Sequence, residues 1–203
     1  MPLESHTSSA TRLFMVRHGE SVANLEARFT RHDDEPLTDR GVEQAVERGR
    51  SLVGLCRPVA LYASPFLRAV RTAQEVGRPF GLVEPTLVPD LREQNFGEFE
   101  GRSYAEFGPL VEKVTALGRW DLSAPGGESL RGVADRVGRA LDELVATHPG
   151  DDVLVVSHGG VMAAARGWAQ GHFEIPPEPT ANADGYVLES SDGRLRLLGF
   201  DSL

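Results

Sequence analysis

The sequence has a single cysteine, Cys56, and no long apolar run. One cysteine excludes an intramolecular disulfide and predicts a reducing compartment, while a membrane span would need about 18 or more consecutive apolar residues. Residues 1–10 lack the apolar segment of a signal peptide and are predicted to form a disordered tail. We therefore expect a cytoplasmic protein with no membrane contact. Residues 11–203 are predicted to form one domain, because a chain of 203 residues suits one hydrophobic core.

Lysine is almost absent, since Lys113 is the only lysine among 21 cationic side chains, and the net charge is −9. Such an acidic chain has no broad basic face for a phosphate backbone, so we expect no nucleic-acid partner. Any anion must be bound by a local cluster of arginines, whose planar guanidinium groups suit phosphate or carboxylate. A GC-rich genome explains the excess of arginine equally well.

Several common catalytic motifs are missing. There is no G-x-G pattern for a dinucleotide and no Gly-Lys-Ser/Thr segment for a nucleotide-binding P-loop. A cysteine phosphatase would need arginine at Tyr62, and a serine hydrolase would need glycine at Val155. No two histidines or cysteines have zinc-binding spacing. Cys56 is therefore interpreted as a small packing residue, and His148 and His172 as surface residues.

Short apolar runs alternate with helical patterns along the chain, which is typical of an α/β sheet. The apolar runs predict strands over residues 13–16, 59–63 and 153–156, with a final pair of strands around 191–193. Helices are predicted after Thr38, over 66–76, from Ser103, over 130–145 and over 161–169.

Polar residues follow each of the three strongest strands. They are Arg17 and His18 after the first strand, Ser64 and Arg68 after the second, and Ser157 and His158 after the third. Because the carboxyl ends of parallel strands form the ligand crevice of an open α/β sheet, these side chains are expected to converge. Helix N-termini after Gly19 and Gly160 would add backbone N–H donors and positive dipole ends. The pattern predicts an anion site on an acidic protein.

Such a site can carry out phosphoryl transfer. Nearby cations favour the neutral form of His18, and a neutral imidazole nitrogen can attack phosphorus in line. Arginines and the second histidine would stabilise charge on the transferring group. The leaving oxygen needs a proton, so a carboxylic acid that is protonated near neutral pH is expected nearby. Spacing alone leaves Glu93, Glu98 and Glu100 open as that acid.

The ordered segments "RHGES" with Asn24, "PLTDRG", "SPFLRAVRTA", "LREQNFGEFEG", "PGGES" and "VVSHGG" carry a specific resemblance. Together they resemble the histidine phosphatase superfamily of phosphoglycerate mutase-like proteins, from about Leu13 to Gly160. The resemblance implies a three-layer α/β/α sandwich with a mixed, mostly parallel central sheet. It also implies no metal and no organic cofactor.

The resemblance assigns roles to individual residues. It implies that His18 becomes phosphorylated, that Arg17, Arg68 and His158 complete the phosphate pocket, and that Glu93 is the proton donor. Other residues expected at the substrate are Ser21, Asn24, Thr30, Arg31 and Gly159. Tyr104 and Phe107 can shape specificity or simply pack.

Three functions are compatible with this chemistry. In the mutases of this family an insertion between the acid and the second histidine helps to exclude water, but here only 65 positions separate Glu93 from His158. This favours a phosphatase acting on a small phosphorylated metabolite, similar to the α-ribazole phosphatase-like and broad-specificity enzymes, as a monomer or homodimer. A cofactor-dependent phosphoglycerate mutase is the alternative. A non-catalytic phospho-ligand-binding module is a third possibility, although both the nucleophile and the acid are present.

One segment departs from the family pattern, where relatives often have glutamine and glycine before the "PLT" segment. Here Thr30 and Arg31 stand in "RFTRHDDEPLT". Arg31 and His32 either contact a second anionic group of the substrate or lie in solvent beside the two aspartates.

If Arg31 binds a second anion, Arg31→Ala should change KM between substrates more than it changes kcat on a generic aryl phosphate. Steady-state kinetics on aryl phosphate and on phosphates with a second anionic group would measure this. An unchanged ranking of substrates would remove Arg31 from the site.

Overall fold

The apolar run from Leu13 to Val16 forms the middle of the first strand, β1 (Thr11–Arg17), and all four residues are fully buried. A strand that is covered on both faces reads as a continuous apolar run, which explains the absence of polar alternation. β1 pairs in parallel with β4 (Asp152–Ser157) and antiparallel with β5 (Gly185–Ser190). The computed structural model describes residues 10–30, 32–117, 120–172, 179–191 and 194–200.

Three further strands complete the sheet: β2 (Pro58–Ala63), β3 (Thr86–Leu87) and β6 (Leu195–Leu198). The strand order is β3-β2-β4-β1-β5-β6. β2 is parallel to β3 and β4, whereas β5 and β6 form an antiparallel pair at one end of the sheet. The prediction of a mixed, mostly parallel sheet is confirmed, as are the final two strands; residues 192–193 between them lie outside the described residues.

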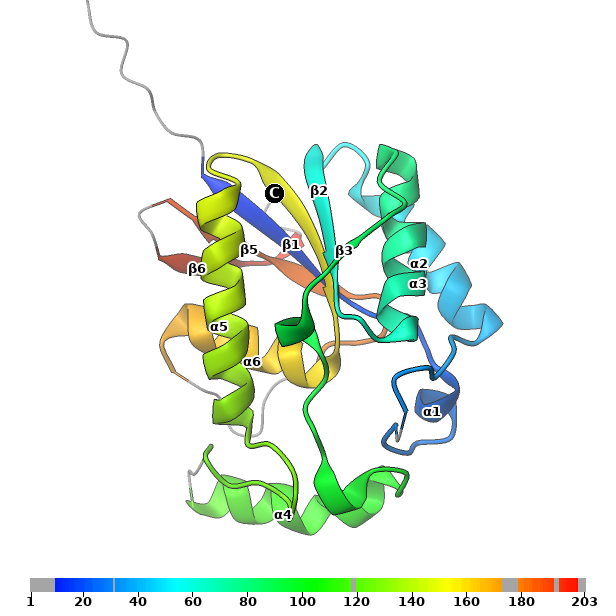
Figure 1. Ribbon diagram of the computed structural model, residues 1–203, viewed down its shortest axis with the longest axis vertical. Helices are drawn as coiled ribbons and strands as arrows, with labels where there is room; N and C mark the ends of the chain where they lie inside the picture. Colours follow the sequence, from blue (N-terminus) through cyan, green and yellow to red (C-terminus); the bar gives the residue numbers. More distant parts are fainter. Residues whose placement is uncertain (1–9, 31, 118–119, 173–178, 192–193, 201–203) are drawn as a thin grey trace, which may run out of the picture.

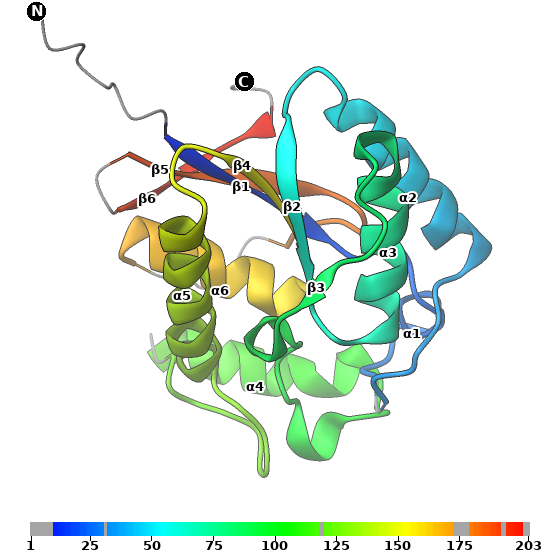
Figure 2. The same ribbon diagram turned by 45° about the horizontal axis from the view of Figure 1, so that its top comes forward.

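Helices cover both faces of the sheet, as Figures 1 and 2 show. Leu13 and Met15 point into a core with α5 (Leu130–Thr147) and α6 (Gly159–Gln170). Phe14 and Val16 point into the other core, with α2 (Asp39–Leu52) and α3 (Leu67–Gly77). Alternate residues of one strand thus pack two helical layers, and the predicted α/β/α sandwich is confirmed.

The helix starts follow capping chemistry. The Thr38 side chain accepts a hydrogen bond from Gly41 N at the start of α2, and Ser129 does the same for Gly132 N at the start of α5. Before α4 (Tyr104–Leu117), Ser103 N donates to the Glu106 carboxylate. The predicted helices are all present, and the ends that the sequence predicted differ by at most two residues.

Several short elements had no clear signal in the sequence. They are α1 (Val22–Leu25), β3, and the 3₁₀ helices η1 (Arg78–Phe80), η2 (Pro89–Leu91) and η3 (Gly97–Phe99). α1 and α4 lie beyond the carboxyl ends of the parallel strands, on the lower side of Figure 1. No helix within the described ranges has the length and apolar character that crossing a membrane requires.

The remaining isolated predictions have mixed outcomes. Cys56 is buried and donates its thiol to Leu52 O (3.6 Å); burial raises its pKa to about 12, in keeping with a packing role. His172 is exposed. His148 is partly exposed, and its ring also hydrogen-bonds the Tyr62 hydroxyl at 2.9 Å, a contact that the sequence did not predict. Residues 1–9 of the predicted tail lie outside the described residues.

Close backbone contact explains two glycines at the start of α2. A Cβ on Gly19 would lie 2.2 Å from Gly41 O, and a Cβ on Gly41 would lie 2.1 Å from Glu20 O. Both distances are far shorter than van der Waals contact, so any side chain would separate α2 from the segment that carries His18. The glycines of "RHG" and "DRG" therefore set how closely α2 approaches the end of β1.

Gly41→Ala is expected to destabilise the fold by about 1–3 kcal/mol, because the backbone must move to accept the methyl group. Gly132 is the control, since an added Cβ there makes only ordinary contacts with Glu128 and Ser129. Gly132→Ala should be neutral or stabilising by up to about 1 kcal/mol. Urea denaturation measures both variants, and equal effects would contradict this reading.

Candidate active site

Three parallel strands end at one cavity of about 330 Å³. Arg17 is the last residue of β1 and His18 follows it, Arg68 is the second residue of α3 just after β2, and His158 follows β4. The ring centroids of His18 and His158 are 5.2 Å apart. The structure therefore brings the predicted residues together. His158 is fully buried beside His18 and is not part of the cavity wall.

The hydrogen bonds of His18 assign its tautomer. Nδ1 lies 2.7 Å from Gly19 O, an acceptor, so Nδ1 carries the proton and donates. Arg68 Nε donates to Nε2 at 3.2 Å, so Nε2 carries the lone pair. Burial, together with the guanidinium groups of Arg68 and Arg17, holds the pKa of His18 well below its ordinary value of 6.5. The ring is thus neutral, and the lone pair of Nε2 accepts a hydrogen bond from Arg68 Nε.

A threonine of α3 holds the His18 segment in place. Gly19 N donates to Thr72 Oγ1 at 3.0 Å, and Thr72 Oγ1 donates to Arg68 O at 2.7 Å. Thr72 is fully buried, so both bonds are shielded from water. The nucleophile candidate and its arginine are therefore attached to the same helix.

Donors around His18 lack partners within the described part of the chain. Arg17 Nε and Arg68 Nη1 are buried and unpaired, although Arg17 Nη1 donates to Thr180 O at 2.6 Å. His158 Nε2 lies 2.7 Å from Ser64 Oγ, and its Nδ1 is unpaired. Buried guanidinium donors without acceptors are costly. A bound anion such as phosphate would satisfy them, which makes this part of the cavity a candidate anion site.

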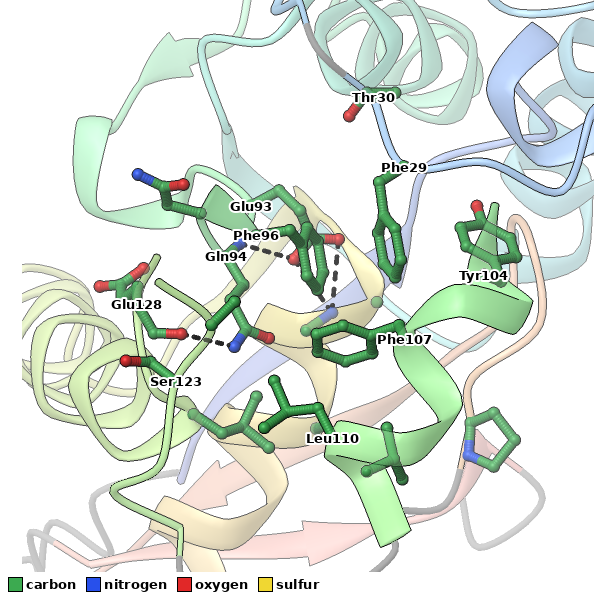
Figure 3. Close-up of a pocket in the computed structure, with 18 of the residues that line it drawn as sticks. Phe29, Thr30, Glu93, Gln94, Phe96, Tyr104, Phe107, Leu110, Ser123 and Glu128 are labelled. Atoms are coloured by element: carbon green, nitrogen blue, oxygen red, sulfur yellow. Dashed lines mark hydrogen bonds between the residues drawn. The ribbon is translucent and has the colours of Figure 1, made fainter. Parts of the chain in front are cut away.

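Glu93 lines the same cavity, where the charges of Arg68 and Arg17 act on its carboxyl group. Its Oε1 accepts hydrogen bonds from Gln94 N (2.8 Å) and Gly160 N (3.1 Å), as drawn in Figure 3. Burial raises the pKa of Glu93 above its ordinary value of 4.5, although these N–H groups and the nearby arginines oppose the shift. Glu98 and Glu100, the other two candidates, are not in the cavity wall.

The helix termini differ from the sequence prediction. The N–H of Gly160, in the first turn of α6, is bonded to Glu93, so it holds the acid and is not free for a ligand. After Gly19, the only helix before α2 is the four-residue α1, which begins at Val22. The positive charge of the site therefore comes mainly from guanidinium groups.

An arginine of α5 holds the segment that carries Glu93. Arg136 is 4% exposed, donates from Nε and Nη2 to the Glu128 carboxylate (2.9 Å each), and also donates to Asp90 O and Glu93 O. Gln94 Nε2 donates to Glu128 O at 2.7 Å. The glutamate of "PGGES" is thus a bridge between α5 and the acid segment.

The expected substrate residues are placed as follows. Ser21, Asn24, Thr30 and Gly159 line the cavity, whereas Arg31 lies outside the described residues and His32 is exposed. The Asn24 carboxamide is already engaged, because it accepts from Ser21 and Asn182 and donates to the Tyr104 hydroxyl at 3.0 Å. It stabilises the cavity wall through these bonds.

Other cavity residues were not identified from the sequence. Thr180 is 8% exposed, lines the cavity and has an unpaired buried hydroxyl, while its carbonyl binds Arg17. Gln94 also lines the cavity. Gln94 is adjacent to the proposed acid, which is a usable signal, but nothing in the proline-rich segment marks Thr180.

The described residues hold no group of three or more His, Cys, Asp and Glu side chains that could bind a metal ion. The chemistry available at the cavity is therefore that of one neutral imidazole, two guanidinium groups, a buried second imidazole and a carboxyl group.

Comparison with known proteins agrees with the family resemblance of the sequence motifs. The chain matches the histidine phosphatase superfamily (branch 1) over residues 13–201. It belongs to this family. A metal-independent phosphoserine phosphatase of Arabidopsis thaliana is 36% identical over 161 residues (77% of this chain, 68% of the relative). A 2,3-bisphosphoglycerate-dependent phosphoglycerate mutase of Azorhizobium caulinodans is 39% identical over 166 residues (75% and 78%).

A solved mycobacterial glucosyl-3-phosphoglycerate phosphatase superimposes on this histidine phosphatase with a TM-score of 0.77 and 29% identity. The match covers 93% of this chain and 98% of that one. Relatives named as phosphatases and as mutases both occur, so family membership leaves the choice between these reactions to the site.

Arg136→Ala is expected to destabilise the protein by about 3–5 kcal/mol, because it leaves the Glu128 carboxylate and two backbone carbonyls without their donor. Arg139 is exposed on the same helix, and Arg139→Ala should stay within about 0.5 kcal/mol of wild type. Chemical denaturation compares the two variants. A small loss at Arg136 would show that the bridge is not needed.

Proposed function

We propose that this histidine phosphatase hydrolyses phosphomonoesters through a phosphohistidine intermediate on His18. The state of the His18 ring supports this most. The ring is buried and neutral with a lone pair on Nε2, and both Arg17 and Arg68 carry an unpaired guanidinium donor. A nucleophile in this state needs no further base, and the donors around it match the oxygens of a phosphoryl group.

In the first step, Nε2 of His18 gives up its hydrogen bond from Arg68 Nε and attacks phosphorus as the bond from phosphorus to the ester oxygen breaks. Arg17 and Arg68 donate to the phosphoryl oxygens, and His158 packs against His18 with ring centroids 5.2 Å apart. Glu93 gives its proton to the leaving oxygen, so the alcohol departs neutral. The products of this step are the free alcohol and phosphorylated His18.

In the second step, the Glu93 carboxylate accepts a proton from water as the water oxygen attacks phosphorus. The N–P bond breaks, His18 Nε2 regains its lone pair, and inorganic phosphate leaves. Glu93 is again protonated, so the cycle closes without any other reactant.

Phosphoglycerate mutase activity remains the second candidate, because relatives carry that name. It would require the phosphoryl group to return to a substrate carbon and not to water. The short separation of Glu93 and His158 supports hydrolysis, since it leaves little chain to close the site. A binding module without turnover is disfavoured because both the nucleophile and the acid face the cavity. The assignment of substrate, beyond a small phosphorylated metabolite, is taken up below.

Three further sequence predictions stay predictions: residues 11–203 as one domain, a cytoplasmic location, and a monomer or homodimer.

His18→Ala should lower turnover of p-nitrophenyl phosphate to the level of the reaction without enzyme. His172→Ala is the matched control, because His172 is exposed and does not line the cavity, and it should retain wild-type turnover. Equal rates in His18→Ala and wild type would disprove the phosphohistidine mechanism. Interconversion of phosphoglycerates with bisphosphoglycerate primer would instead support the mutase.

The pH profile should reflect the two shifted groups. His18 acts unprotonated, and its pKa lies well below 6.5, so kcat/KM should fall only in strongly acidic solution. Glu93 acts protonated, and its pKa lies above 4.5, so the rate should fall as pH rises through that raised value.

Glu93→Gln should remove the alkaline fall and slow an alkyl phosphate about 100- to 10,000-fold. It should lower kcat/KM for p-nitrophenyl phosphate much less, because kcat/KM reports phosphorylation of His18 and nitrophenolate leaves without a proton. An unchanged profile in Glu93→Gln would exclude Glu93 as the acid.

A further inference from the structure

Two groups of residues with different chemistry line the cavity. The first consists of Arg17, His18, Arg68 and Glu93. The second consists of aromatic and aliphatic side chains from the loop after α1, the segment after η2, helix α4 and the segment before α5. They include Phe29, Phe96, Phe107, Leu110, Val111 and Leu122.

The aromatic wall is one continuous cluster (Figure 3). Phe29 is at its centre, with ring centroids 4.1 Å from Phe96, 4.8 Å from Tyr104 and 5.1 Å from Phe107. Phe29, Phe96 and Phe107 are each half-buried, so part of every ring remains available to a ligand. The phenylalanines therefore form a wall of the cavity and not only a packed core.

Helix α4 turns an apolar stripe toward the cavity. Tyr104, Phe107, Leu110 and Val111 all line it, at the three- and four-residue spacing that places side chains on one helix face. Figure 3 shows Phe107 and Leu110 on the side of α4 that faces Glu93 and Gln94. The part of a substrate beyond its phosphate would lie against this face.

Charges in the cavity wall are confined to the first group of residues and one paired acid. Among the described lining residues the only cations are Arg17 and Arg68, and both lie beside His18. The remaining carboxylate, Glu128, is paired with Arg136. A second anionic group on the substrate would therefore find no further cation among the described lining residues, and an unpaired charge in the cavity is costly.

We propose that the preferred substrates are monophosphate esters of uncharged aromatic or long aliphatic alcohols, with the alcohol against Phe29, Phe107 and Leu110. This inference rests on the proposed phosphohydrolase function of the same site. It disfavours substrates with a carboxylate or a second phosphate, such as phosphoserine, 3-phosphoglycerate and bisphosphates.

A series of alkyl phosphates tests this directly on the wild-type protein. From ethyl to butyl to hexyl phosphate, kcat/KM should rise about threefold to fourfold per methylene until the cavity is filled, mainly through KM. Naphthyl phosphate should exceed phosphoserine and 3-phosphoglycerate by at least about 100-fold. A flat alkyl series, or a preference for the anionic substrates, would overturn the inference.

Variants locate the effect. Leu110→Ala should reduce the ratio of kcat/KM for hexyl phosphate to that for ethyl phosphate by about tenfold. Val59→Ala is the matched control, because Val59 is an exposed apolar residue of β2 that does not line the cavity, and the ratio should not change. An unchanged ratio in Leu110→Ala would remove α4 from the binding surface.

The same experiment separates this inference from the proposed function. If all esters phosphorylate His18 but react at the same rate, only the substrate class is wrong. If 3-phosphoglycerate is preferred and Arg31→Ala abolishes that preference, the substrate carries a second anion and the inference is overturned. If no ester is hydrolysed and His18 is never phosphorylated, the proposed function itself fails.

Discussion

The hydrogen bond from Arg68 Nε to His18 Nε2 is the interaction on which the site depends. This bond requires the tautomer in which Nε2 is unprotonated, and the bond from Nδ1 to Gly19 O selects the same tautomer. Since both partners are buried, the guanidinium also disfavours protonation of the imidazole. One arginine therefore orients the nucleophile, keeps it neutral and still has a second nitrogen free for phosphate.

The order of the strands in the sheet brings the residues of the site together. His18 and His158 are adjacent because β1 and β4 are parallel neighbours in register, with Arg17 paired to Ser157. Arg68 reaches His18 because β2 is the next strand and α3 starts within four residues of its end. Glu93 comes from outside the sheet, so its position needs other supports: Gly160 N and the bridge of Arg136 to Glu128.

Sequence reasoning predicted the parts of the site that come directly from strand ends. Short continuous apolar runs identify buried strands, and parallel strands bring their carboxyl ends together, so Arg17, His18, Arg68 and His158 follow from pattern alone. Glu93 did not follow from spacing, because "REQNFGEFE" offers three equivalent glutamates and the selection depends on tertiary contacts with α6. The contact of His148 with Tyr62 was not predicted for the same reason, since Tyr62 lies 86 positions away in sequence. The apolar wall of the cavity was not predicted, because it depends on where α4 packs. The helical pattern of α4 does not show which element its apolar face contacts.

Identification of the phosphorylated atom tests the central claim most directly. Protein quenched in alkali during turnover of a phosphomonoester keeps phosphohistidine intact, and digestion followed by isomer analysis locates the phosphoryl group. The account predicts phosphate on Nε2 of His18, because Nδ1 is committed to Gly19 O. Phosphate on Nδ1, on another residue, or on no residue while turnover continues would contradict it.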